Sequence, residues 1–351
     1  MRSEKRSGLA LLALGLVLAL AGCGSTPEVQ EGSAQTVLTQ LQPLKAGDIA
    51  ESKALNTQAQ NGVCRGQTQQ NATAWQQYTH EGIYVDVNTA SCGFSETPLY
   101  FTSIGGLSTH WVSSGATSIY TPTPTGFRIY VHLPGITPGQ ANAYGWHINW
   151  QATPNNLRQP TLCTGQTQQN ATAWQQYTHE GIYVDVNTAS CAFSETPLYF
   201  TSIGGLSTHW VSSGATSIYT PTPTGFRIYV YLPGITPGQA NAYGWHINWQ
   251  ATPNNLRQPT LCTGQTQQNA TAWQQYTHEG IYVDVNTASC AFSETPLYFT
   301  SIGGLSTHWI SSSATSIYAP TPTGFRIYVY LPGITPGQAN AYGWHINWSM
   351  R

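Results

Sequence analysis

The chain has 351 residues, of which only 7% are charged and 12% are aromatic. Its 12 lysine and arginine residues stand against 14 aspartate and glutamate residues, which gives a formal net charge of −2. This balance argues against nucleic-acid binding, because phosphate recognition needs an excess of basic side chains. The many aromatic and β-branched residues argue against disorder over most of the chain.

Residues 1–22 have the pattern of a signal peptide. Basic residues are followed by an apolar stretch from Leu9 to Ala21, which is too short to predict a membrane-spanning helix. The sequence Leu20-Ala21-Gly22-Cys23 resembles the lipobox of bacterial lipoproteins. The resemblance implies cleavage before Cys23, acylation of Cys23 and a lipid anchor in a bacterial cell envelope. Gly24 follows the cysteine, and the absence of an aspartate there implies the outer membrane or the cell surface. The alternative is a secretory signal followed by an unrelated cysteine.

Residues 23–63 contain the cysteine and a polar stretch in which Pro27 and Pro43 interrupt any long helix. We expect this stretch to be a flexible tether.

A unit of 99 residues is then repeated three times almost unchanged, as repeat 1 (64–162), repeat 2 (163–261) and repeat 3 (262–351). The near-identity predicts three equivalent sites. It does not indicate which positions matter, because neutral positions have had little opportunity to change.

Each repeat contains two cysteines at the same spacing. An even number of cysteines in an exported protein predicts one disulfide per repeat, facing an oxidising compartment. Pairing between repeats is the less simple alternative, and the lack of any CxxC motif argues against zinc. The predicted pairs are Cys64–Cys92, Cys163–Cys191 and Cys262–Cys290.

The first repeat predicts short strands separated by turn signals at intervals of about ten residues. Strict alternation of apolar and polar residues marks the two clearest, at 82–88 and 127–133. In the last strand Trp146, Ile148 and Trp150 are expected to be buried. Thr137 and Pro138 predict the start of a short helical turn. The other predicted strands are 75–78, 98–104, 117–120 and 144–150.

This pattern predicts an all-β fold of three tandem small antiparallel β-sandwich domains, each with one disulfide. We expect the domains to lie in a row. The segments 151–160 and 250–259 are predicted to be short linkers that contain proline and restrict the domain orientations.

Three segments of each repeat resemble the H-type lectin domain. They are a strand ending in Ser-Ile-Gly-Gly, the strand Thr-Gly-Phe-Arg-Ile-Tyr-Val and a terminal Trp-x-Ile-x-Trp strand, within Pro98 to Trp150. The resemblance implies a six-stranded sandwich that binds galactose-type sugars in clefts at the subunit contacts of a trimer, which three domains on one chain would imitate. Arg128 and Trp146-His147 are the nearest counterparts of the family site. No loop aspartate matches the acidic residue of the family site, so the resemblance does not extend to the sugar specificity.

The chain predicts no enzyme, cofactor or metal site. It has no GxSxG motif, and the three histidines of each repeat lie on separate elements. An exposed aromatic ring beside histidine and arginine donors instead suits a sugar. The predicted ligand-binding residues are His110, Trp111, Arg128 and His147, with their equivalents His209, Trp210, Arg227, His246, His308, Trp309, Arg326 and His345.

We therefore expect a multivalent, surface-anchored carbohydrate-binding lipoprotein, whose partners are a glycan or cell-surface polysaccharide and the membrane. The alternative is a non-catalytic adhesion or spacer protein that binds a protein partner or self-associates.

Overall fold

The computed structural model describes residues 57–60 and 62–350. The signal peptide, Cys23 and most of the predicted tether lie outside the described residues. Strand β1 (Thr57–Gln60) falls within the segment predicted as tether and pairs with β2 (Val63–Gln67), so the tether prediction extends too far toward the first repeat.

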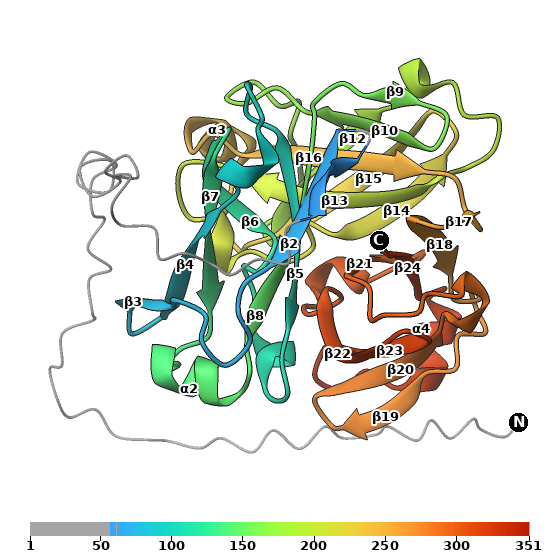
Figure 1. The fold of residues 1–351 in the computed structure, drawn as a ribbon. Helices are drawn as coiled ribbons and strands as arrows, with labels where there is room; N and C mark the ends of the chain where they lie inside the picture. Colours follow the sequence, from blue (N-terminus) through green and yellow to red (C-terminus); the bar gives the residue numbers. More distant parts are fainter. Residues whose placement is uncertain (1–56, 61, 351) are drawn as a thin grey trace, which may run out of the picture. The chain divides into compact units, whose positions relative to one another are not determined.

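Repeat 1 is a sandwich of two antiparallel layers (Figure 1). One layer contains β2, β8 (His147–Thr153) and β5 (Leu99–Gly105), in that order. The other layer runs in the order β3, β4, β7 and β6, with bounds Gln76–Thr79, Gly82–Asn88, Gly126–His132 and Ser118–Thr123. The predicted all-β fold with three disulfide-containing domains is confirmed.

The helical elements of the repeat are short. Thr137 caps α2 (Pro138–Ala143) through a capping box with Gln140, as its sequence predicts. The two single-turn helices are η1 (Ala90–Cys92) and η2 (His110–Val112).

Repeats 2 and 3 reproduce these elements in the same order. The second sandwich contains β9 (Arg158–Gln159), which lies at the end of repeat 1. It also contains β10 (Leu162–Gln166), β11 (Gln175–Thr178), β12 (Gly181–Asn187), η3 (Ala189–Cys191), β13 (Leu198–Gly204), η4 (His209–Val211), β14 (Ser217–Thr222), β15 (Gly225–Tyr231), α3 (Pro237–Ala242) and β16 (His246–Thr252). The third sandwich contains β17 (Arg257–Gln258), which lies at the end of repeat 2. It also contains β18 (Leu261–Gln265), β19 (Gln274–Thr277), β20 (Gly280–Asn286), η5 (Ala288–Cys290), β21 (Tyr298–Gly303), η6 (His308–Ile310), β22 (Ser316–Thr321), β23 (Gly324–Tyr330), α4 (Pro336–Ala341) and β24 (His345–Met350).

The core of each sandwich contains the residues that the alternation predicts to face inward. Trp146, Ile148 and Trp150 are fully buried, as are Phe127 and Ile129. Apolar burial of this kind is the main stabilising contribution in a domain of this size.

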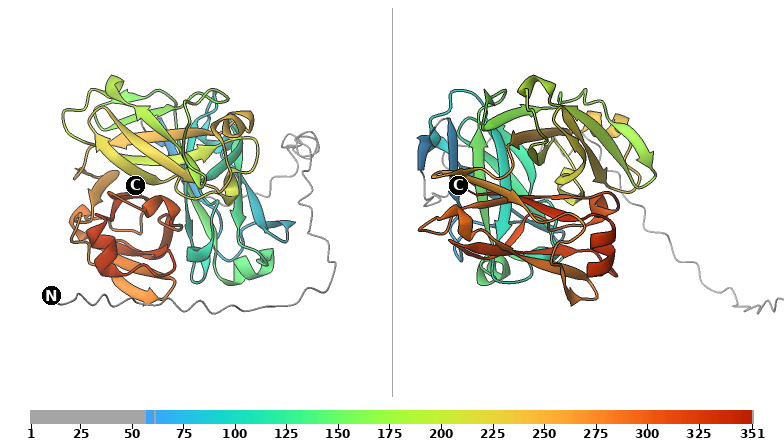
Figure 2. Two further views of the ribbon diagram at one scale, coloured as in Figure 1. Left: turned by 180° about the vertical axis from the view of Figure 1, so that it is seen from behind. Right: turned by 90° about the vertical axis from the view of Figure 1, so that its right-hand side faces the viewer.

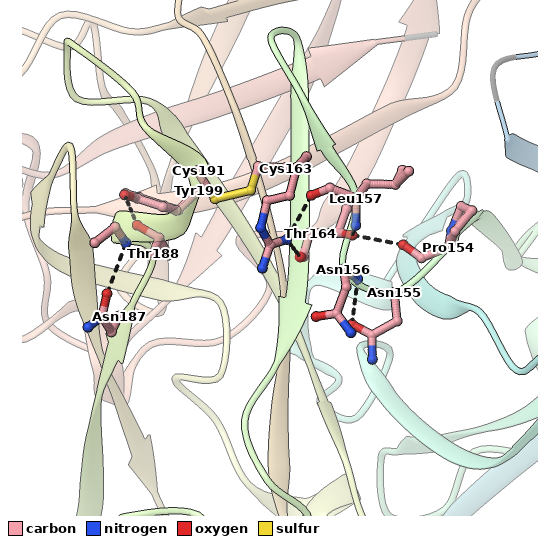
Figure 3. Close-up of a disulfide and its surroundings, with 12 residues drawn as sticks. Pro154, Asn155, Asn156, Leu157, Cys163, Thr164, Asn187, Thr188, Cys191 and Tyr199 are labelled. Atoms are coloured by element: carbon pink, nitrogen blue, oxygen red, sulfur yellow. Dashed lines mark hydrogen bonds between the residues drawn. A yellow bond between two sulfur atoms is a disulfide. The ribbon is translucent and has the colours of Figure 1, made fainter.

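One disulfide closes a loop in each repeat, joining the first strand of the repeat to the single-turn helix after the alternating strand; Figure 3 shows the one in repeat 2. In repeat 2, Cys163 on β10 is bonded to Cys191 at the end of η3, and the hydroxyl groups of Thr188 and Tyr199 form a hydrogen bond beside it. Closing a loop of this length stabilises a domain by roughly 3–4 kcal/mol in the chain-entropy model.

The three sandwiches do not lie in a row as expected, because short parallel strand pairs join each repeat to both others. β6 pairs with β13, β14 pairs with β21, and β22 of repeat 3 returns to pair with β5 of repeat 1. Each eight-stranded sheet therefore takes four strands from one sandwich and four from another. The pairing satisfies backbone groups that an isolated sandwich would leave open at its sheet edges.

About half of each segment predicted as a linker is part of the sheets. Residues 151–153 belong to β8, and Arg158–Gln159 form β9, which pairs with β10. The ribbon views from two further sides show the three repeats, coloured blue to green, green to yellow and orange to red, packed against one another (Figure 2). We call this arrangement the ring of repeats.

Candidate functional site

The predicted ligand residue His110 is completely buried where repeat 1 meets repeat 3. Its ring stacks on Tyr318 with the ring centroids 3.8 Å apart, and its Nε2 donates to the carbonyl oxygen of Ile317 at 3.1 Å. Burial lowers the pKa of His110 to about 3, so the ring is neutral. His209 and His308 make the same stack on Tyr120 and Tyr219. These histidines hold the repeats together, where no ligand reaches them.

Trp111 also packs against the neighbouring repeat. It is 7% exposed and lies edge-on to Tyr276 and Tyr330, with ring centroids 5.2 and 5.4 Å apart. Trp210 and Trp309 make the equivalent contacts with repeats 1 and 2. The aromatic residues that exceed the needs of one small core are therefore used between repeats, where edge-to-face pairs are favourable.

Arg128 lies on the outer sheet face of β7. Its Nε and Nη2 donate to the two carboxylate oxygens of Asp86 at 2.7 and 2.8 Å, and its guanidinium lies 4.2 Å from the ring centre of Tyr84. Arg227 and Arg326 form the same pairs with Asp185 and Asp284. The strand pairing of β4 with β7 places Asp86 directly opposite Arg128.

His147 lies at the start of β8, and its Nδ1 is 2.9 Å from the carbonyl oxygen of Gly145. Burial lowers its pKa. His110 and His147 flank the Gly105-Gly106 pair of the same repeat, whereas Trp111 and Arg128 lie elsewhere. The four predicted ligand residues of one repeat therefore do not converge on one cleft.

A cleft of about 350 Å³ opens between repeats 2 and 3. We call it the inter-repeat cleft. Its size lies at the lower end of the range for small-molecule sites. His345, the equivalent of His147, is the one predicted ligand residue in its lining. Repeat 2 contributes Thr196, Pro197, Leu198, Tyr199, Ile218, Tyr219, Thr220, Pro221 and Asn254, and repeat 3 contributes Gln265, Gln268, Gly303, Gly304, Leu305, His345 and Asn347.

The lining carries polar groups but no carboxylate, lysine or arginine. Asn347 lies on β24, and its Nδ2 donates to Ser301 at 3.2 Å. In repeat 2 the equivalent Asn248 is 4% exposed, and its Oδ1 has no hydrogen-bond partner among the described residues. A buried acceptor without a partner is costly, so this oxygen is suited to receive a hydrogen bond from a ligand or water.

The glycine pair at the end of β21 is required by the close approach of two histidines. A Cβ on Gly303 would lie 2.2 Å from Nε2 of His345, and one on Gly304 would lie 2.8 Å from Nδ1 of His308. The chain then turns and leaves Leu305 68% exposed at the cleft. The two glycines of the Ser-Ile-Gly-Gly sequence therefore end the strand and also leave room for the two histidines beside the cleft.

The sequence interpretation missed the amide side chains of the cleft. Asn149, Asn248 and Asn347 alternate with the buried tryptophans of the last strand, so the same pattern that predicts the core could have placed them on its outer face. The contribution of the preceding repeat, such as Tyr219, has no comparable signal, because it depends on the ring of repeats.

Among the described residues, no group of histidine, cysteine, aspartate and glutamate side chains could hold a metal ion. Within the same part of the chain, no helix is long and apolar enough to cross a membrane. No protein-family model, no curated protein and no solved structure matches the chain.

Proposed function

We propose that the protein is a multivalent carbohydrate-binding protein whose sites are the inter-repeat clefts. The observation that carries the proposal is the cleft between Tyr219 of repeat 2 and Asn347 of repeat 3, which is uncharged and contains amide, hydroxyl and imidazole groups beside apolar surface. Sugars present hydroxyl groups and apolar ring faces together, and such a lining is complementary to both.

A binding role accounts for the lining better than catalysis does. General acid–base chemistry on a glycosidic bond uses a pair of carboxyl groups, and the cleft lining contains none. The lowered pKa of His345 keeps its imidazole neutral, which suits hydrogen bonding to a hydroxyl group.

The ring of repeats supports multivalency. The 99-residue period repeats most of the cleft lining where repeat 1 meets repeat 2 and where repeat 3 meets repeat 1, so we expect a cleft at these contacts as well. Several sites on one body increase the apparent affinity for a repetitive glycan without any new contact.

We further propose that Cys23 is acylated and tethers the ring to a bacterial envelope. Two or more acyl chains give stable anchoring, since each buried methylene contributes roughly 0.8 kcal/mol. Metabolic labelling with a palmitate analogue tests this: label should enter the wild-type chain and not the Cys23→Ala variant, and equal labelling of both would contradict the anchor.

A glycan array tests the sugar-binding function. We expect the full chain to bind at least one neutral glycan, and the Gln70→Ala/Gln169→Ala/Gln268→Ala variant to bind it at least fivefold more weakly. Gln268 lines the cleft and is exposed, so its truncation should leave the fold intact.

The adjacent glutamines provide a matched control. Gln69, Gln168 and Gln267 are also exposed but do not line the cleft, so their replacement by alanine should leave binding unchanged. Absence of binding to every glycan, or equal loss in both variants, would contradict the proposed function. A protein partner that free sugars do not displace would favour the adhesion alternative.

A further inference from the structure

A second hollow of about 290 Å³ lies on the outer sheet of repeat 2. We call it the side depression. It lies across β12, β14 and β15 and is lined by Asp185, Val186, Asn187, Thr220, Thr222, Gly225 and Phe226. Unlike the inter-repeat cleft, it contains a carboxylate.

Thr220 lines both hollows, so they meet at this residue. It lies in β14 where the pairing with β15 shifts register between Tyr219 and Thr222. Irregularities of this kind redirect side chains and are frequent next to functional sites. The Thr220 hydroxyl group makes no hydrogen bond to any described residue, which leaves it free for a ligand.

The backbone at Thr220 is strained. Its φ of +43° lies in the left-handed region, where a β-branched residue is an outlier. The equivalent Thr121 has the same φ of +43°. Backbone strain of this kind is concentrated at ligand sites. A turn with only a structural role would be more stable with a residue such as glycine, which adopts this φ without strain.

The side depression offers hydrogen-bond acceptors in a fixed position. Both oxygens of Asp185 accept from Arg227 at 2.7 Å, and the aspartate side chain is still 54% exposed. A carboxylate has about four acceptor positions, so oxygens oriented by arginine can also receive hydroxyl groups of a ligand.

We propose that the inter-repeat cleft and the side depression together bind a neutral glycan of at least two sugar units. The terminal unit occupies the cleft, the next unit lies over Asp185 and Asn187, and the Thr220 hydroxyl hydrogen-bonds at the junction. This inference rests on the proposed sugar-binding function. It adds the minimum length of the glycan and names Thr220 as the residue that distinguishes a disaccharide from a single sugar.

One of the three repeats naturally lacks the threonine hydroxyl group at this junction. Repeat 3 has Ala319 where the other repeats have Thr121 and Thr220, and its φ of +44° shows the same backbone without the hydroxyl group. The site that uses Ala319 should therefore gain less from the second sugar unit than the site that uses Thr220.

The test compares one sugar with its extended form on the full chain. The array carries galactose, N-acetylgalactosamine, glucose, mannose and fucose, each as a methyl glycoside and as the terminal unit of a disaccharide. For the best pair, titration calorimetry should show tighter binding of the disaccharide. In the Thr121→Ala/Thr220→Ala variant this gain should fall by about tenfold, which corresponds to one hydrogen bond to a ligand.

Stability is measured beside binding to exclude loss of folding. Alanine relieves the strain of a β-branched residue at positive φ, so the double variant should melt at the same temperature as the wild type or higher. The reverse change, Ala319→Thr, should increase the gain from extension.

The outcomes separate the two proposals. The extended site would be overturned if disaccharides bound no more tightly than methyl glycosides, or if the double variant kept the full gain in affinity from the second sugar. Either result would leave the proposed sugar binding intact. Absence of binding to every glycoside and disaccharide would overturn both.

Discussion

His110 of repeat 1 stacks on Tyr318 of repeat 3, with the ring centroids 3.8 Å apart although 208 positions separate the residues in the chain. The Tyr318 hydroxyl also accepts a hydrogen bond from the backbone N–H of Trp111 at 3.1 Å. The contact joins the last repeat to the first and so closes the ring of repeats. The equivalent stack of His308 on Tyr219 holds repeats 2 and 3 side by side, and the inter-repeat cleft opens between them.

The hydroxyl group of Tyr318 should contribute measurably to stability. In the Tyr318→Phe variant the buried N–H of Trp111 loses its acceptor, which should lower the free energy of unfolding by about 1–2 kcal/mol. Urea denaturation of the full chain checks this. Tyr342→Phe is the control, since its hydroxyl makes no hydrogen bond to a described residue; equal effects of the two changes would contradict the role assigned to Tyr318.

Stability should decrease as the pH falls below about 6.5. Burial holds the pKa of His110, His209 and His308 at about 3, below the value of about 6.5 expected in the unfolded chain. Between these values the unfolded state binds more protons, so stability that is fully present above pH 6.5 is lost as the pH falls towards 3.

Each such histidine should contribute a slope of up to about 1.4 kcal/mol per pH unit. Urea midpoints measured from pH 8 to pH 4 give the slope for the wild type, and His308→Gln should reduce it because glutamine does not titrate. An unchanged slope in this variant would show that His308 does not remain neutral in the folded state.

Ser313 should be less favourable than the glycine found at its position in the other repeats. Its φ is +74°, and Gly115 and Gly214 have φ values of +83° and +84°. A Cβ on Gly214 would lie 2.5 Å from the carbonyl oxygen of Tyr229 and 2.6 Å from that of Trp309. Ser313→Gly should therefore stabilise the chain by about 1 kcal/mol, and Gly214→Ser should destabilise it by at least as much.

Thermal unfolding should show a higher melting temperature for Ser313→Gly and a lower one for Gly214→Ser than for the wild type. A lower melting temperature for Ser313→Gly would contradict the strain argument.

Ser349 interrupts a contact between buried glutamines. Gln151 donates from Nε2 to Oε1 of Gln250 at 2.7 Å, and the period of 99 places Ser349 at the third equivalent position. Oε1 of Gln151 and Oγ of Ser349 both lack partners among the described residues. Ser349→Gln should supply a donor to Gln151 and stabilise the chain by about 1 kcal/mol.

Ser349→Ala provides the comparison for this change. It removes the unpartnered hydroxyl group but supplies no donor, so its effect on the urea midpoint should be smaller than that of glutamine. The opposite order would show that a third glutamine does not fit.

The sequence predicted what depends on a single repeat. Alternation identified β4 and β7 almost residue for residue and placed Trp146 and Trp150 in the core. Equal cysteine spacing identified the disulfides. The parallel strand pairs were missed because each involves only two residues from each strand, too few to leave a periodic signal.

The candidate site was predicted less well for the same reason. A loop position suggested that Trp111 is exposed, but the neighbouring repeat covers it. His345 lies at the cleft only because the sandwich of repeat 2 forms the opposite wall. Because the repeats are nearly identical in sequence, their differences do not indicate which face of a sandwich contacts its neighbour.

The most direct test of sugar binding at the inter-repeat cleft is a crystal structure of the full chain soaked with the tightest-binding glycan of the array. We expect density for its terminal sugar between Tyr219 and Asn347, within hydrogen-bond distance of the Asn347 amide. Density at another surface, with the cleft empty, would contradict it.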